Sequence, residues 1–250
     1  MTAPVLEAIG LRKAWGGVAA VDGVSLAVQP GEMLALIGPN GAGKSTCFNM
    51  LNGQIRPDGG QVRLMGRDIT GLPPRRVWRL GVGRTFQVTA TFGSMTVLDN
   101  VRMALLSHHR RLAGFWRPGA SLFEAESLAA LEQVGLAAQA DRSCGVLAYG
   151  DLKRLELAIA LANAPRLLLM DEPTAGMAPA ERAGLMALAS AIARERGIGV
   201  LFTEHDMDVV FGHADRVLVL DRGQLIAAGS PGEIRANPTV RDVYLGQGIA

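Results

Sequence analysis

The hydrophobic and polar positions along the chain predict strands that alternate with helices. Apolar and polar residues alternate over 5–12 and 18–28, which is typical of strands with one buried face. The uninterrupted apolar run at 33–37 is typical of a strand buried in a parallel sheet, and further buried strands are predicted at 166–170 and 198–202. An edge strand is predicted at 62–66, a strand that continues the sheet at 217–220, and a strand that returns as an edge hairpin at 224–229. Helices are predicted over about 44–51, within LPPRRVWRL (72–80) and over 179–196.

The stretch between about Thr96 and Ala162 has helical character throughout. Thr96 is placed to cap the helix VLDNVRMALL, and Ser121 with Glu124 forms a capping box for a second helix. Strands alternating with helices on either side predict an α/β fold with a mostly parallel sheet core, antiparallel edge strands and an inserted α-helical subdomain. We expect one domain over 1–250, divided into a core lobe (1–90 and 165–230), the helical subdomain (about 91–164) and a C-terminal helical tail (231–250).

Composition narrows the class of protein. The 250 residues favour one large domain, and 49% hydrophobic with 19% charged residues is ample for a core. No run approaches the ~18 apolar residues of a membrane helix, and we expect no secretion signal in the opening MTAPVLEAIG. Two cysteines without metal spacing favour a reduced, cytoplasmic setting. A net charge of +2 gives no indication of nucleic-acid binding.

The motif GPNGAGKST (38–46) lies between a buried strand and a helix and fits G-x-x-x-x-G-K-S/T. Its glycines let backbone N–H groups surround phosphates without Cβ clashes. Lys44 then supplies a compact charge to the β- and γ-phosphates, and Ser45 a hydroxyl to Mg²⁺. The chain has 22 arginines and only three lysines, so a lysine here indicates a need for a point-like ammonium. A merely structural glycine-rich turn is the alternative interpretation.

Two carboxylates end one buried strand, and a histidine follows another. RLLLMDEP places Asp171 and Glu172 at the edge where ligands gather in open α/β sheets. Asp171 is positioned to hold Mg²⁺ and Glu172 to polarise an attacking water, although such a pair alone is also compatible with a solvated turn. His205 ends GVLFTEH at the same edge and can reach a γ-phosphate, whereas His108 and His109 are predicted to be solvated surface.

Together these motifs resemble those of the ATP-binding subunits of ABC transporters, and the similarity covers essentially the whole chain. GPNGAGKST corresponds to the Walker A loop, LLLMDE to Walker B, RTFQ to the Q-loop and LAYGD (147–151) to the signature. His205 takes the place of the switch histidine, and Trp15 that of an aromatic ring stacked on adenine. The resemblance implies that ATP and Mg²⁺ bind and that ATP lies between two head-to-tail domains. It implies Glu172, His205, Lys44 and Gln87 for catalysis, Ser45, Gln87 and Asp171 for the metal, and, for the nucleotide, Trp15, Gly38, Pro39, Asn40, Gly41, Ala42, Gly43, Lys44, Ser45, Thr46, Ala148, Tyr149, Gly150 and Asp151.

The signature departs from the family pattern. Its helix points N–H groups and a positive dipole at ATP bound by a partner, yet Ala148 replaces the usual Ser and Asp151 the usual Gln. Losing one hydroxyl-to-phosphate hydrogen bond costs about 1.5–3 kcal/mol. The following loop, AGMA (175–178), also has Ala178 where an acid is common. Two interpretations stay open: the chain offers its partner a weakened signature, or backbone N–H groups suffice and the alanine is neutral.

Two segments narrow the resemblance to ATPases of branched-chain amino acid importers: GVGRTFQVTATFGSMTVLDNV (81–101) and the tail GSPGEIRANPTVRDVYLG (229–246). That group implies two transmembrane permease subunits, a second ATPase chain (a homodimer being the other possibility) and, indirectly, a periplasmic solute-binding protein. It also implies a peripheral position on the cytoplasmic face of the inner membrane. Related systems import urea or short amides. The alternatives are the homodimeric ATPase of a lipopolysaccharide-type exporter and a non-transport ABC ATPase, which would carry coiled-coil, zinc or duplicated modules.

Arginines cluster on either side of the Q-loop. Between Asp99 and Glu124 there is no acidic residue, and the basic residues of the two clusters are Arg75, Arg76, Arg79, Arg84, Arg102, Arg110, Arg111 and Arg117, with Trp116 among them. Such clusters are usually solvated faces. In a subunit docked below a membrane they can instead face anionic headgroups or loops of the membrane partner.

Overall fold

The strands assemble into two sheets rather than one. The computed structural model describes residues 3–85, 91–111 and 122–245. An antiparallel four-stranded sheet has the order β2-β1-β4-β5, formed by β1 (Leu6–Trp15), β2 (Val18–Val28), β4 (Gly59–Leu64) and β5 (Arg67–Asp68). The second sheet has the order β10-β9-β3-β8-β7-β6 and is parallel except for β10 against β9. Its strands are β3 (Met33–Ile37), β6 (Val82–Thr85), β7 (Leu167–Asp171), β8 (Gly199–Thr203), β9 (Arg216–Asp221) and β10 (Gln224–Gly229).

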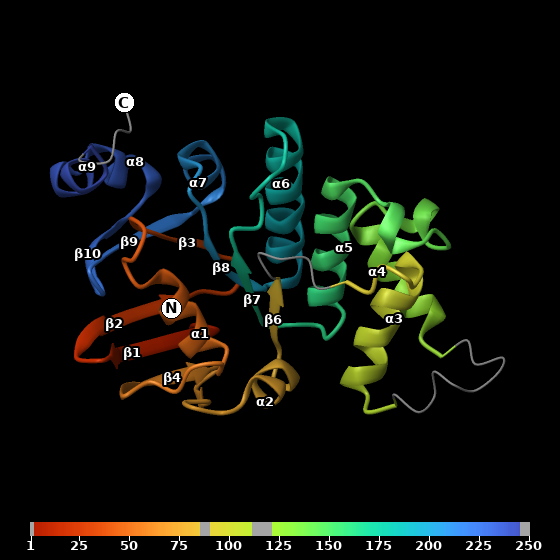
Figure 1. Cartoon of the computed structure of the whole chain (residues 1–250), viewed down its shortest axis with the longest axis horizontal. Coiled ribbons are helices and arrows are strands. Elements are labelled where there is room, and N and C mark those ends of the chain that lie inside the picture. Colours follow the sequence, from red (N-terminus) through yellow and green to blue (C-terminus); the bar gives the residue numbers. More distant parts are fainter. Residues whose placement is uncertain (1–2, 86–90, 112–121, 246–250) are drawn as a thin grey trace.

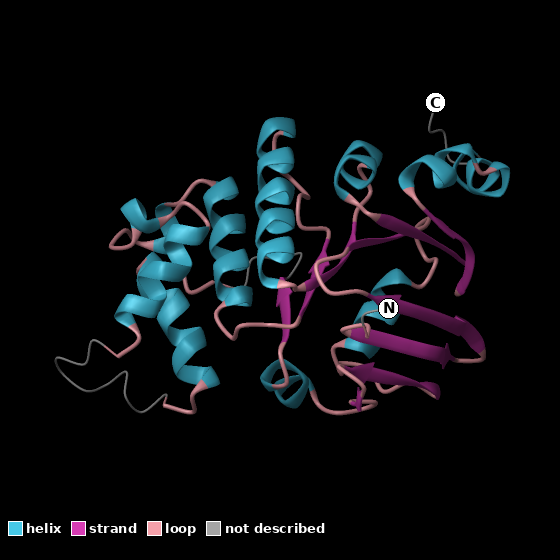
Figure 2. Ribbon diagram, turned by 180° about the vertical axis from the view of Figure 1, so that it is seen from behind, coloured by secondary structure: helices cyan, strands magenta, loops and turns pink. Residues whose placement is uncertain are grey.

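The buried strands separate two hydrophobic cores. Side chains alternate across a strand, so Met33, Ala35 and Ile37 of β3 join one core while Leu34 and Leu36 join the other. The first core lies under the helices on one face of the six-stranded sheet, and the second lies between that sheet, the four-stranded sheet and α1 (Lys44–Leu51) (Figures 1 and 2). Both faces of the strand are therefore buried, which explains the unbroken apolar runs.

Three helices follow one another between β6 and β7: α3 (Val97–His108), α4 (Glu124–Gln133) and α5 (Tyr149–Leu161). Figure 1 shows them side by side at one end of the molecule. The predicted cap of α3 is confirmed, because the Thr96 hydroxyl accepts from the Asp99 N–H at 3.0 Å. The remaining helices are α2 (Pro74–Arg79), α6 (Pro179–Arg196), α7 (Met207–His213), α8 (Pro231–Ala236) and α9 (Pro238–Leu245). Among the described residues, no helix combines the length and apolar character needed to cross a bilayer.

Several local predictions were wrong. The helix α4 begins after Phe123, whose backbone is left-handed (φ 63°), and Ser121 lies outside the described residues. The strand predicted at 62–66 is not an edge, because β4 lies between β1 and the two-residue β5. Nor is His108 solvated surface: its ring meets Trp78 edge-on at 5.4 Å between centroids. The neighbouring His109 is exposed, as predicted, and its ring stacks on Phe123 at 4.6 Å between centroids.

Candidate active site

The phosphate-loop motif connects β3 to α1 and requires glycine at two positions. A Cβ on Gly38 would lie 2.1 Å from the Leu220 carbonyl oxygen, and one on Gly43 would lie 2.2 Å from the Ala20 carbonyl oxygen. Gly43 also has φ 104°, a conformation that L side chains rarely adopt. Lys44 follows directly, and its ammonium donates to the carbonyl oxygens of Gly38 at 2.6 Å and Pro39 at 3.1 Å. The loop thus folds around its own lysine, while the Ser45 side chain is exposed.

The carboxyl ends of β7 and β8 place the acidic residues and the histidine beside this loop. Asp171 pairs with Thr203 in the parallel ladder, and its Oδ1 accepts from the Thr203 hydroxyl at 2.8 Å. Glu172 follows in a left-handed conformation (φ 48°), held by N–H donation to Thr203. Its Oε1 lies 2.9 Å from His205 Nε2. A non-glycine residue with positive φ at such a place is strained, and strain of this kind concentrates at functional sites.

Electrostatics link the lysine to both carboxylates. Burial lowers the pKa of Lys44, and the charges of Glu172 and Asp171 oppose that effect. The buried ammonium is satisfied by the two loop carbonyls described above, which limits the penalty for burying its charge. The structure therefore brings together Lys44, Asp171, Glu172 and His205, which are far apart in the sequence.

Arg84 belongs to this site and not to an exposed basic cluster. Its side chain is only 13% exposed, and its guanidinium donates to Asp171 Oδ2 at 3.4 Å. It also donates to the side-chain oxygens of Asn49 and Gln54, both at 3.0 Å. Sequence reasoning missed this role because Arg84 stands 87 positions from Asp171. The predicted Gln87 lies outside the described residues.

Trp15 is exposed, and the C-terminal tail borders the phosphate loop. Trp15 ends β1 with 53% of its surface exposed, and the Lys13 ammonium lies 4.8 Å from its ring centroid. A cleft of about 550 Å³ adjoins the phosphate loop; it is lined by Pro39, Asn40, Gly41, Ala42, Asp221, Arg222, Thr239, Asp242 and Val243. The last three belong to α9, so the tail helix forms one wall beside the loop.

The signature residues lie apart from the phosphate loop of their own chain. The helix α5 begins at Tyr149, with Ala148 at its N-cap and no side-chain cap. Within the described residues, no hydrogen bond or ion pair joins 148–151 to 38–46, and Figure 1 shows α5 well separated from α1. The Asp151 carboxylate accepts from Gln139 Nε2 at 2.8 Å, which holds it against the neighbouring turn.

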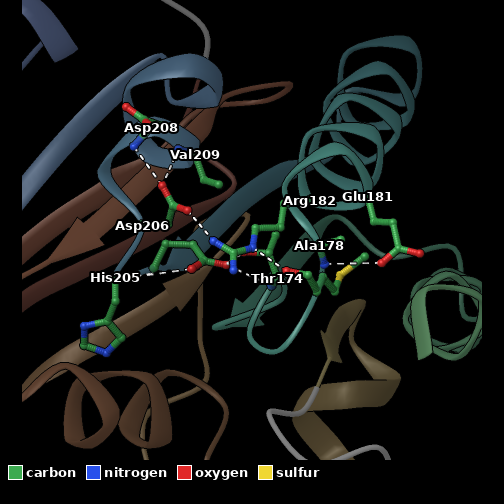
Figure 3. Close-up of polar contacts among 10 residues, drawn as sticks. Thr174, Ala178, Glu181, Arg182, His205, Asp206, Asp208 and Val209 are labelled. Carbon is green, nitrogen blue, oxygen red and sulfur yellow. Dashed lines mark hydrogen bonds and ion pairs between the residues drawn. The ribbon is translucent and has the colours of Figure 1, made fainter.

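A polar network joins the loop after β7 to the loop after β8 (Figure 3). Ala178 N-caps α6 and has no side-chain oxygen to offer; its own N–H donates to Glu181 at 3.3 Å. Arg182, on the same helix, donates to the Met177 carbonyl at 2.7 Å and to the Asp206 carboxylate at 2.5 Å. Asp206 in turn caps α7, directly after His205.

Cys47, three residues after Lys44, is buried, and burial raises the pKa of its thiol to about 12. The thiolate is therefore scarce at neutral pH, which favours a small hydrophobic role over a redox switch.

Known proteins resemble this chain over its full length. The pattern of the ABC transporter family matches residues 21–175, and that of branched-chain amino acid ATP-binding cassette transporters matches 224–250. The high-affinity branched-chain amino acid transport ATP-binding protein BraF of Pseudomonas aeruginosa is 43% identical, with 99% of this chain and 100% of BraF covered. LivG of Escherichia coli, with the same description, is 40% identical at the same coverage. An ATP-binding cassette of an ABC transporter, solved in its ADP conformation, superposes with a TM-score of 0.88 at 32% identity, covering 98% of this chain and 100% of that one.

Proposed function

Since this chain belongs to the ABC transporter family of ATP-binding proteins, we propose that it is the ATP-hydrolysing motor subunit of an importer for branched-chain or other hydrophobic amino acids. The full-length similarity to BraF and LivG carries this proposal, and the match of the tail over 224–250 supports it independently of the ATPase motifs. Both relatives are named for branched-chain amino acid transport, which argues against the exporter alternative. Urea or a short amide is the remaining alternative for the solute.

The phosphate loop is proposed to hold the nucleotide phosphates. Lys44 exchanges its bonds to the Gly38 and Pro39 carbonyls for bonds to β- and γ-phosphate oxygens, which suit a compact ammonium better. The free N–H groups at the start of α1 add to this anion site. The exposed ring of Trp15 is the proposed adenine platform.

The residues at the sheet edge also fit Mg²⁺. A carboxylate has about four acceptor positions, so the bonds from Thr203 and Arg84 leave Asp171 able to bind a cation. Asp171 and the exposed Ser45 hydroxyl are proposed to hold the metal together with phosphate oxygens and with Gln87. In the described part of the chain no group of three or more acidic, His or Cys residues could hold a metal by itself, which agrees with a cation that arrives with the nucleotide. When bound, Mg²⁺ neutralises charge on the phosphates.

Glu172 is the proposed general base. Its left-handed backbone and its two bonds to Thr203 fix where the carboxylate emerges from β7. The 2.9 Å contact with His205 orients it further, and His205 is placed to reach the γ-phosphate once the site is filled. Gln87 is assigned to the same site by the resemblance alone.

A second ATPase chain is proposed to complete the site. The separation of 148–151 from the chain's own phosphate loop supports a head-to-tail pair in which α5 of each chain points its N-terminus at the partner's nucleotide. A heterodimer is the preferred pairing and a homodimer the alternative. The hydrogen bond from Gln139 holds the Asp151 carboxylate against the neighbouring turn, so that its charge does not repel an incoming phosphate. The proposed partners are two permease subunits and, through them, a periplasmic solute-binding protein. The proposed location is the cytoplasmic face of the inner membrane. The division into core lobe, helical subdomain and tail remains part of the proposal.

Restoring the signature hydroxyl tests whether Ala148 weakens this contact. Ala148 already has the extended backbone of an N-cap (φ −62°, ψ 152°) and is exposed, so Ala148→Ser is expected to cap α5 and add about 1 kcal/mol to the free energy of unfolding. If the hydroxyl also reaches the partner's phosphate, closure becomes about 10–150 times more favourable and ATPase activity of the assembled complex rises. Unfolding and ATPase assays on the same variant separate the two effects. Added stability without added activity would show that backbone N–H groups suffice.

The transport assignment is tested by uptake of labelled leucine in cells that lack this protein. Uptake is expected to fall to background and to return with the wild-type chain, but not with a Glu172→Gln chain expressed to the same level. Labelled urea serves as the control solute. Unchanged leucine uptake in the depleted cells would contradict the amino acid assignment, and a selective loss of urea uptake would replace it.

A further inference from the structure

Four arginines from separate elements surround one pocket. The pocket has a volume of about 290 Å³, and its arginines are Arg67 of β5, Arg76 and Arg79 of α2, and Arg110 just after α3. The side chains of Leu72 and Leu80 complete its lining. In Figure 1 the helix α2 and the end of α3 lie at the bottom of the molecule, opposite α8 and α9 at the top. We call this set the arginine pocket.

The described residues that line the arginine pocket include no acidic residue. Within the described residues none of its four arginines forms an ion pair. Residues 69–123 contain eight arginines and a single acidic residue, Asp99, which lies 3.7 Å from Arg102. The segments outside the described residues contain no Asp or Glu either. Asp99 therefore faces Arg102, and Asp68, which follows Arg67 in β5, accepts hydrogen bonds from Gln61 and from the Thr70 N–H.

The arginine side chains in and beside the pocket also repel one another. Burial lowers the pKa of Arg79, and the charges of Arg75 and Arg110 lower it further. The Nε of Arg79 is buried and has no hydrogen-bond partner among the described residues. A buried donor without an acceptor is unfavourable, and a bound anion would relieve both this and the repulsion.

The backbone at Arg110 adds an independent argument. Arg110 has φ 56°, and the Arg111 N–H donates to the Leu106 carbonyl at 2.8 Å, which is the helix-end turn where glycine is usually found. An arginine side chain makes this turn less favourable than glycine would. Helix termination therefore does not explain why a guanidinium stands here, whereas its place in the pocket does.

We propose that the arginine pocket binds the phosphate group of an anionic membrane lipid. Guanidinium forks match phosphate oxygens in pairs, and clusters of basic residues favour anionic bilayer surfaces. The two leucines supply an apolar wall for the glycerol and the first acyl carbons, which a free phosphate or an acidic peptide carboxylate would leave unused. This site is additional to the nucleotide site and requires neither ATP nor a permease.

Vesicle flotation of the isolated full-length protein tests the proposal. The wild-type chain is expected to float with phosphatidylcholine vesicles that contain phosphatidylglycerol, and not with phosphatidylcholine alone. Arg79→Gln and Arg110→Gly should each weaken binding about fivefold, and Arg110→Lys should retain most of it. Arg110→Gly should unfold no more easily than wild type, because glycine suits the turn, and should hydrolyse ATP normally. The control Arg241→Gln removes one exposed arginine from α9, at the opposite end, and should float like wild type.

Flotation that does not depend on phosphatidylglycerol, or that is equal for Arg79→Gln, Arg110→Gly and Arg241→Gln, would overturn the proposal. If inorganic phosphate stabilises the protein against unfolding but the protein does not float with vesicles, the lipid assignment is wrong and the pocket binds a soluble anion. Because the assay involves no hydrolysis or uptake, its failure leaves the proposed motor function standing, and a failed uptake experiment leaves the pocket standing.

Discussion

Replacing Glu172 with glutamine is expected to lower ATP hydrolysis about 10²–10⁴-fold, which is the usual contribution of a positioned general base. Glutamine keeps the shape of the side chain and its 2.9 Å proximity to His205, but its amide cannot accept a proton from water. Binding of ATP should persist, because Lys44 and the phosphate loop are unchanged. Phosphate release measured beside Asp208→Asn, an exposed carboxylate-to-amide change in α7, gives the matched comparison. Equal activities of the two variants would remove Glu172 from the chemistry.

The same variant reports on pairing, because blocked hydrolysis should trap the closed pair. Sizing chromatography of Glu172→Gln with and without Mg-ATP is expected to show a monomer alone and an ATP-dependent dimer once the second ATPase chain is added. An ATP-dependent dimer of this chain by itself would show that the Ala148 signature closes competently. That result would replace the heterodimer with a self-paired motor.

Gly43→Ala is expected to be strongly destabilising. The new Cβ would lie 2.2 Å from the Ala20 carbonyl oxygen, and its backbone would be held at φ 104°. Overpacking and positive φ together should lower the free energy of unfolding by about 2–5 kcal/mol. Because α1 must shift away from β2, ATP binding should be lost as well.

Gly41→Ala in the same loop is the control for stability. Gly41 has φ 80°, yet a Cβ there would meet no atom within 4 Å, so only the backbone penalty of about 1–2 kcal/mol applies. Urea unfolding of both variants without nucleotide therefore isolates the contact with Ala20. Equal losses of stability would mean that the loop relaxes around the added methyl group.

The sequence predicted the parts of the fold that are local or periodic. The prediction that the apolar runs form buried strands is confirmed, because alternate residues of a strand such as β3 enter different cores. The strand β6 (Val82–Thr85) was missed because Gly83 and Arg84 interrupt its apolar character, and only pairing with β7 identifies it. The strands β1, β2, β4 and β5 form a separate antiparallel sheet, which depends on pairing between segments such as β1 and β4 and is encoded by no single segment.

In the candidate site, too, local features could be predicted from the sequence and contacts between distant segments could not. The phosphate loop, Asp171, Glu172 and His205 could be predicted because each lies at or just after the end of a buried strand, and parallel strands end at a common edge. Arg84 could not, because its bond to Asp171 depends on the neighbouring positions of β6 and β7. The arginine pocket likewise unites β5, α2 and the end of α3, so the sequence alone suggested a basic surface without its geometry.

Arg182 couples the loop after β7 to the loop after β8. It donates to the Met177 carbonyl on one side and to the Asp206 carboxylate on the other, so we expect displacement of the AGMA loop to shift Asp206 and the neighbouring His205. A partner that binds more tightly when the AGMA loop is displaced than when it is not would therefore also change the occupancy of the nucleotide site. Linkage makes the effect mutual: the nucleotide must change the partner's affinity by the same factor. Association and ATP binding are then two readouts of one coupling free energy. A variant that breaks the Arg182 contacts should reduce, by one common factor, the partner's effect on ATP affinity and the effect of ATP on the partner's affinity.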